Sequence, residues 1–196
     1  IGYINLGSIS KKELKTAFKK FTKTKGIIID LRNYPKNISN SDIAKYLYPK
    51  RKKFIKVLFP IKGRPSHAKF EKATLSFIKD PFTSGSKNSN YYKGKIVLLV
   101  NYFTQSKAEF IGMTIQASPN CVTVGEQTAG SVMNITTYNL PDGTAINFTC
   151  LGAFYPNGEG TQKKGLKIDH LINETTTNFL DDPYMTYSIE LIRNNN

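Results

Sequence analysis

Two residues in the stretch NYFTQSKAEFIG, residues 101–112, have the types and the spacing to do chemistry. Ser106 lies where an apolar run gives way to a helical pattern, and Glu109 follows three residues later. A serine with a glutamate at that distance is the capping box that begins many helices. A serine between a buried strand and a helix is also where α/β enzymes expose an attacking hydroxyl. The window therefore predicts that a helix starts at Ser106 and leaves both roles of its hydroxyl open.

Other reactive side chains occur in less informative settings. His67 lies in a loosely patterned segment and His170 directly follows Asp169, and we interpret both histidines as surface residues. Cys121 and Cys150 lack the CxxC spacing of a metal or redox site. They either pair in an oxidising compartment or remain buried free thiols. Because the sequence has no cluster of metal ligands and no phosphate-binding glycine loop, we expect no metal and no cofactor.

The composition is that of a single globular domain with an uneven charge. The chain has 196 residues, of which 39% are hydrophobic, and a net charge of +14. Residues 1–95 hold 23 Lys or Arg against 5 Asp or Glu, whereas residues 96–196 hold 5 against 9. Such asymmetry can mark a polyanion-binding face. Only four of the 28 basic residues are Arg, however, so a solvated lysine surface is favoured and no nucleic-acid partner is expected.

The elements that must position Ser106 alternate between strands and helices. Apolar strands are predicted within residues 1–7, 26–33, 95–101 and 121–127, and helices within 7–26, 39–49, 106–118 and 181–194. Strand, helix and strand at this spacing form parallel βαβ units. Residues 53–59 are predicted as a further strand, 67–78 as a helix in the least organised part of the chain, and 135–155 as a hairpin around the turn PDG. No apolar run is long enough to span a membrane.

Four motifs in order resemble the S41 family of serine peptidases, the C-terminal-processing and tricorn-core group. They are GIIIDLRNYPKN, VNYFTQSKAEF, TVGEQTAG, and LPDGTAINFT leading to GLKID, and the resemblance covers nearly all of residues 1–192. It implies an α/β domain of the crotonase and ClpP-like type, with a mostly parallel sheet flanked by helices, over residues 1–196. It also implies a peptide or protein substrate, Ser106 as the nucleophile, and Glu109 as an acid that orients or polarises the catalytic group.

The resemblance implies an oxyanion hole as well. Its backbone donors would be Lys36, where the family has glycine, and Lys107, which follows the nucleophile; losing one such donor costs about 10²–10³ in rate. At the position of the lysine in a Ser–Lys dyad this sequence has Ser131. We therefore expect the base to be a histidine upstream of Ile1, in a longer precursor of which this chain is a fragment with little activity of its own.

Two alternatives and one expectation about location accompany this interpretation. Lys36 and Asn37 stand where the family has glycines, and Ser131 stands where a Ser–Lys dyad has lysine. These substitutions leave open the alternative that the chain is a catalytically inactive relative that binds peptides. The basic N-terminal half leaves a polyanion-binding protein open. Family members with a separate upstream segment are commonly exported, so the resemblance implies a periplasmic or cell-surface protein whose upstream domain is a partner of this core.

Overall fold

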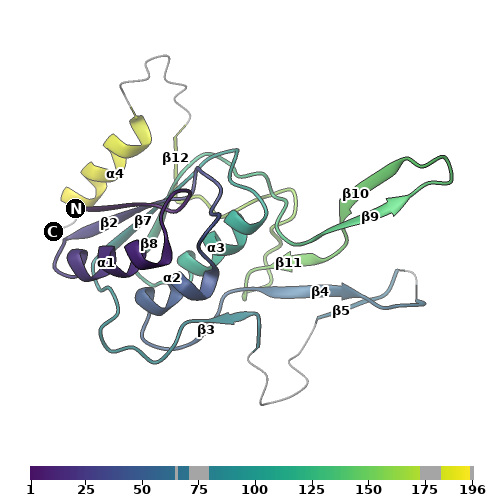
Figure 1. Ribbon diagram of the computed structural model, residues 1–196, viewed down its shortest axis with the longest axis horizontal. Coiled ribbons are helices and arrows are strands. Elements are labelled where there is room, and N and C mark those ends of the chain that lie inside the picture. The colour runs from purple at the N-terminus through teal and green to yellow at the C-terminus, as the bar shows by residue number, and fades with distance from the viewer. Residues whose placement is uncertain (65, 71–79, 173–181, 195–196) are drawn as a thin grey trace.

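A five-stranded parallel sheet forms the centre of the protein (Figure 1). The structure is a computed structural model that describes residues 1–64, 66–70, 80–172 and 182–194. The strands lie in the order β1 (Gly2–Asn5), β2 (Gly26–Asp30), β7 (Lys95–Val100), β8 (Cys121–Gly125) and β12 (His170–Leu171). All four pairings between neighbours are parallel. The predicted α/β class with a mostly parallel sheet is confirmed.

The order of the strands decides where the helices lie. The strands follow one another across the sheet in the same order as along the chain, so each connection moves in the same direction. Because connections between parallel strands are right-handed, such connections place their helices on the same face of the sheet. The helices α1 (Lys11–Phe21), α2 (Asn40–Leu47) and α3 (Lys107–Gln116) pack on that face. The last helix, α4 (Pro183–Arg193), covers the opposite face (Figure 1). The sheet is thus buried between two helical layers.

Burial on both faces explains the consecutive isoleucines of β2. Ile27 and Ile29 belong to the larger core beneath α1, α2 and α3, whereas Ile28 belongs to the smaller core beneath α4. Successive side chains of a strand point to opposite faces. A strand between two helical layers therefore needs an unbroken apolar run rather than an alternating one.

The predicted helix starts are confirmed at their capping residues. At α1, the Glu13 amide donates to Ser10 Oγ at 3.3 Å and the Ser10 amide donates to Glu13 Oε2 at 2.8 Å. At α4, Asp182 accepts a hydrogen bond from the Met185 amide at 3.0 Å, and Pro183 occupies the first turn. Both arrangements supply acceptors to amides that have no partner within the helix.

Shorter strands extend from this core. They are β3 (Lys52–Lys53), β4 (Lys56–Pro60), β5 (Ala68–Phe70), β6 (Thr83–Ser84), β9 (Ile135–Asn139), β10 (Ala145–Thr149) and β11 (Gly152–Phe154). The antiparallel pairing of β9 with β10 confirms the predicted hairpin around the turn PDG, which projects from the body of the protein in Figure 1. The prediction extended too far, because β11 at its end pairs with β4 instead. The strand predicted over residues 53–59 divides between β3 and β4.

The helix predicted over residues 67–78 is wrong at its beginning. Ala68–Phe70 forms β5, which pairs with the edge of β4. Pairing with an available strand edge outweighs a weak local helical pattern, because strand formation depends on tertiary context. Residues 71–78 of that prediction lie outside the described residues.

The cysteines do not form a disulfide. Cys121 is partly buried, Cys150 is exposed, and both are free thiols. The two cysteines therefore carry no information about the redox compartment. In the described part of the chain, no helix combines the length and the apolar character that crossing a membrane requires.

Candidate active site

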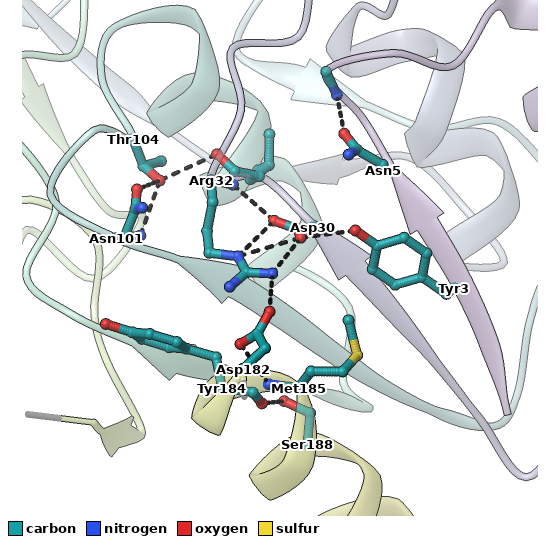
Figure 2. Close-up of polar contacts among 12 residues, drawn as sticks. Tyr3, Asn5, Asp30, Arg32, Asn101, Thr104, Asp182, Tyr184, Met185 and Ser188 are labelled. Carbon is teal, nitrogen blue, oxygen red and sulfur yellow. Dashed lines mark hydrogen bonds and ion pairs between the residues drawn. The ribbon is translucent and has the colours of Figure 1, made fainter. Parts of the chain in front are cut away.

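Ser106 lies at the carboxyl edge of the sheet, where the loops after β2, β7 and β8 meet. Thr104, which is buried, joins these loops: its hydroxyl donates to the Leu31 carbonyl at 3.1 Å, and its own carbonyl accepts from the Ala129 amide at 3.1 Å. Figure 2 shows the adjoining contact in which the Asn101 amide donates to Thr104 Oγ1 at 3.1 Å. The turn that leads into Ser106 is thus fixed to both neighbouring loops.

The backbone of Ser106 is strained, and Ser106 and Glu109 form a capping-box arrangement at the start of α3. Ser106 has φ 52° and ψ −116°, a conformation that non-glycine residues adopt rarely and at a cost of about 1–3 kcal/mol. It is half-buried at the N-terminus of α3 and lines a cavity of about 470 Å³. The predicted helix start is confirmed, and a serine in this position can serve both as a cap and as a nucleophile.

Glu109 is a buried carboxylate that ties two loops together. It is only 1% exposed. Oε1 accepts from Thr128 Oγ1 and from the Gly130 amide, both at 2.7 Å. Oε2 accepts from the amides of Ser131 at 2.9 Å and Ser106 at 3.2 Å. These four donors compensate the burial of the charge, and they make Glu109 a support for the strained turn rather than a free acid or base.

The loop opposite Ser106 is held from its far side. Gly130 has φ 67°, and a Cβ there would come within 2.8 Å of the Lys163 amide nitrogen. That amide donates to the Gly130 carbonyl at 2.8 Å, and the Leu166 amide donates to Thr128 Oγ1 at 2.8 Å. Only glycine fits this close approach. Sequence reasoning missed Thr128, although its place in the motif GEQTAG was a usable signal.

The segments that carry the two expected oxyanion donors are in contact. The Lys107 ammonium donates to the Lys36 carbonyl at 3.2 Å, so the loop after β2 adjoins the start of α3. Among the described residues, neither the Lys36 nor the Lys107 amide donates a hydrogen bond to another group. Lys36 and Asn37 both have negative φ. The amide of Lys107 also lies at the positive end of the α3 dipole, which favours a nearby anion.

An ion-pair cluster anchors the base of the loop after β2 (Figure 2). Asp30, 2% exposed, accepts from Arg32 Nη2 at 2.7 Å and from the Tyr3 hydroxyl at 2.9 Å. The same Arg32 nitrogen lies 2.8 Å from Asp182, and its guanidinium stands 5.4 Å from the Tyr184 ring centre. The cluster therefore links β1, β2 and the N-terminus of α4.

The surroundings of the cluster shift the pKa values of Arg32 and Tyr3. Burial alone lowers the pKa of Arg32, but hydrogen bonds to Asp30 and Asp182 outweigh this effect and hold the pKa above its ordinary value. Burial, reinforced by the charge of Asp30, raises the pKa of Tyr3 to about 12. Arg32 is therefore a fixed cation that stabilises two carboxylates, and its contacts are structural.

Neither histidine lies at Ser106. His170 Nδ1 is 2.9 Å from the hydroxyl of Tyr187 on α4, on the face of the sheet opposite α3. His67 lies in the turn between β4 and β5, and the residues that line the Ser106 cavity include neither histidine. Asp169 accepts a hydrogen bond from the backbone of β8 at 2.8 Å, which is a structural role. Within the described ranges, no three His, Cys, Asp or Glu residues form a metal-binding group.

Comparison with known proteins places this geometry in a family. The profile of peptidase family S41 matches residues 1–172. A carboxyl-terminal-processing protease of Synechocystis is 23% identical over 188 residues, which are 92% of this chain and 40% of that protein.

Solved structures share the fold. A candidate peptidase from Parabacteroides merdae has a TM-score of 0.73 at 17% identity, over 97% of this chain and 60% of its own. The photosystem II D1 C-terminal processing protease has a TM-score of 0.58 at 21% identity, over 87% and 42%. The tricorn protease has a TM-score of 0.58 at 22% identity, over 98% and 17%. The chain spans less than two thirds of each relative named here. Because the family profile covers most of its length, the chain belongs to peptidase family S41.

Proposed function

We propose that the chain is the core of a serine endopeptidase in which Ser106 is the nucleophile. The observation that carries the proposal is the strained turn at Ser106, which lies at a helix N-terminus and lines a cavity. Strain of this kind persists only where the surrounding structure enforces it, and it gathers at functional sites. Glu109 and Thr104 supply that enforcement here.

In the proposed reaction, Ser106 Oγ attacks the scissile carbonyl carbon and transfers its proton to a base. The amides of Lys36 and Lys107 donate to the oxygen that becomes negative. The protonated base then gives its proton to the leaving amine, and water hydrolyses the acyl-enzyme with the same base. Glu109 acts through position, since its hydrogen bond to the Ser106 amide holds the turn.

The base belongs to a part of the protein other than this core. His67 and His170 lie away from the cavity, and Ser131 stands where the family's dyad has lysine. A histidine from an upstream segment of the same protein is our proposal for this role. Residues 1–196 expressed alone are accordingly expected to cleave casein poorly compared with the full-length protein.

Cleavage of fluorescent casein by the full-length protein tests the proposal. Ser106→Ala should lower the rate at least about a thousandfold, since nucleophile removal is among the largest single losses in such enzymes. Ser131→Ala is the matched control, because Glu109 is bound by the Ser131 amide and not by its hydroxyl. Undiminished cleavage by Ser106→Ala would refute the assignment.

A second candidate is a peptide-binding protein without catalysis, and the Ser131 substitution favours it. In that case the full-length wild type binds peptides but leaves casein intact. The third possibility, polyanion binding through the lysine-rich half, requires affinity for a polyanion that falls steeply with salt. We further propose an extracytoplasmic location, to be tested by the accessibility of the protein to added protease in intact cells.

A further inference from the structure

We infer that the cavity beside Ser106 is a specificity pocket for a large, uncharged apolar side chain of the substrate. This inference rests on the proposed peptidase function and adds the class of residue at which cleavage occurs. The cavity measures about 470 Å³, a size typical of small-ligand sites. Its apolar lining consists of Tyr34, Pro81, Phe82, Phe110 and Met133.

The walls come from separate segments and are held in place. Phe110 follows Ser106 by four residues, so both lie on one side of α3. Its ring meets the buried ring of Phe54 edge to face, with centroids 4.9 Å apart. Phe82 is itself buried and lies 6.3 Å from the ring of Phe59. The aromatic surface therefore exists before a substrate arrives, and burying an apolar side chain there requires little ordering of the protein.

Backbone strain occurs on both sides of the same cavity. Met133 has φ 96°, and with Ser106 it is one of four described non-glycine residues with positive φ. Both residues line the cavity. Strained backbone on two separate loops at one cavity indicates that the surrounding structure enforces its shape.

The charges around the cavity disfavour ionised side chains. Among the described residues that line it, Lys107 alone is charged, and its ammonium is directed to the Lys36 carbonyl. None of these described lining residues is an acid. A substrate lysine or arginine would lose water against aromatic walls without gaining a counter-ion. A carboxylate would meet Lys107 at the rim but would also be desolvated by the same walls.

Covalent geometry assigns the pocket to the acyl side of the scissile bond. On that side, the Cα that carries the side chain is bonded directly to the attacked carbonyl carbon. On the leaving side, the peptide nitrogen lies between the carbonyl carbon and the next Cα. Because Ser106 itself lines the cavity, we assign the cavity to the nearer side chain, the one on the acyl side.

A binding measurement tests the pocket without depending on catalysis. The full-length Ser106→Ala protein is titrated with fluorescent peptides identical except for a C-terminal norleucine, lysine or alanine, and binding is followed by anisotropy. Norleucine and lysine side chains have the same carbon chain but differ in charge. We expect the norleucine peptide to bind about ten- to a hundredfold more tightly than either other peptide. Equal affinities, or a preference for lysine, would overturn the inference.

Two tyrosines provide matched variants. Tyr34, which is 45% exposed, lines the cavity, whereas Tyr102, 61% exposed in the loop after β7, does not. Tyr34→Ala should bring the norleucine-to-alanine ratio to within about threefold of unity, and Tyr102→Ala should leave the ratio unchanged. Tyr34→Asp should shift the preference toward lysine. If neither Tyr34→Ala nor Tyr34→Asp changes the relative affinities for the three peptides, the assignment of the pocket is refuted.

Cleavage of the same sequences in longer peptides separates this inference from the proposed function. Ser106-dependent cleavage without preference for norleucine would refute the pocket and leave the peptidase assignment intact. A norleucine preference in binding, without any Ser106-dependent cleavage by the wild type, would support the pocket and refute the peptidase assignment.

Discussion

Replacing Glu109 with glutamine should both destabilise the protein and disturb the Ser106 turn. The substitution preserves size and removes only the charge and one acceptor atom. Each carboxylate oxygen of Glu109 accepts from two donors. Whichever way the glutamine amide is turned, its NH₂ group faces two donors and can accept from neither.

The expected loss follows from those contacts. A buried donor left without a partner costs about 1–3 kcal/mol. If the NH₂ group replaces Oε1, the Gly130 amide alone loses its acceptor, because the Thr128 hydroxyl can turn to accept from the NH₂ group. If it replaces Oε2, the amides of Ser131 and Ser106 both lose theirs. The glutamine should therefore adopt the first orientation, with a loss of about 1–3 kcal/mol. For a chain of this size, the midpoint of thermal unfolding should fall by about 2–4 °C for each kcal/mol.

Urea unfolding monitored by circular dichroism measures this loss, with Glu190→Gln on the exposed side of α4 as a control of equal charge change. The control should remain within about 0.5 kcal/mol of the wild type, as surface substitutions generally do. An unfolding free energy for Glu109→Gln equal to that of the control would refute the support role of Glu109.

Three further changes have expected outcomes. Arg32→Leu leaves the buried Asp30 carboxylate without its cation and should lower the free energy of unfolding in urea by about 3–5 kcal/mol. An effect below about 1 kcal/mol, which is the range of exposed ion pairs, would contradict the structural role of the pair. Tyr48→Phe removes a buried hydroxyl whose contact with the Ser84 side chain is too poor in geometry to count as a hydrogen bond, so stability at pH 8 should rise by up to about 1 kcal/mol. Burial raises the pKa of Tyr48 to about 12, so the folded state favours the neutral phenol. That stabilisation is complete below about pH 10 and is lost as the pH rises toward 12. The free energy of unfolding should therefore fall less steeply with pH above about pH 10 in Tyr48→Phe than in the wild type. A thiol reagent such as DTNB should modify the exposed Cys150 quickly and Cys121 slowly, because burial raises the pKa of Cys121. Cys150→Ser should remove the fast phase of the reaction. If the fast phase persists in that variant, Cys150 is not the more accessible thiol.

Local patterns were sufficient to predict the helices and the main strands of the central sheet, but not every element. The isoleucine run 27–29 predicted a strand covered on both faces, and the spacing of Ser10 and Glu13 predicted the start of α1. The strand β5 could not be predicted this way, because its pairing partner β4 decides its conformation. Local sequence determines an element where its signals are strong, and tertiary contacts determine it where they are weak.

The candidate site likewise depends partly on local sequence signals and partly on tertiary contacts. The spacing of Ser106 and Glu109 predicted the helix start, but the choice between cap and nucleophile depends on a φ angle that loops from two other strands enforce. Three of the four donors to Glu109 lie 19 to 22 residues farther along the chain and return to it only through β8. The pocket walls likewise come from segments far apart in sequence, and only Phe110, one turn after Ser106, had a local signal.

Covalent labelling of the nucleophile tests the central claim most directly. The full-length protein is treated with a fluorophosphonate and digested with trypsin, and the modified residue is located by mass spectrometry. The tryptic peptide of residues 96–107, IVLLVNYFTQSK, contains a single serine, Ser106. The proposed mechanism predicts that the phosphonyl group is found on Ser106 of this peptide and that prior incubation with a cleaved substrate slows its attachment. A protein that cleaves casein while this peptide stays unmodified, or whose label lies on another residue, would contradict the assignment of Ser106 as the nucleophile.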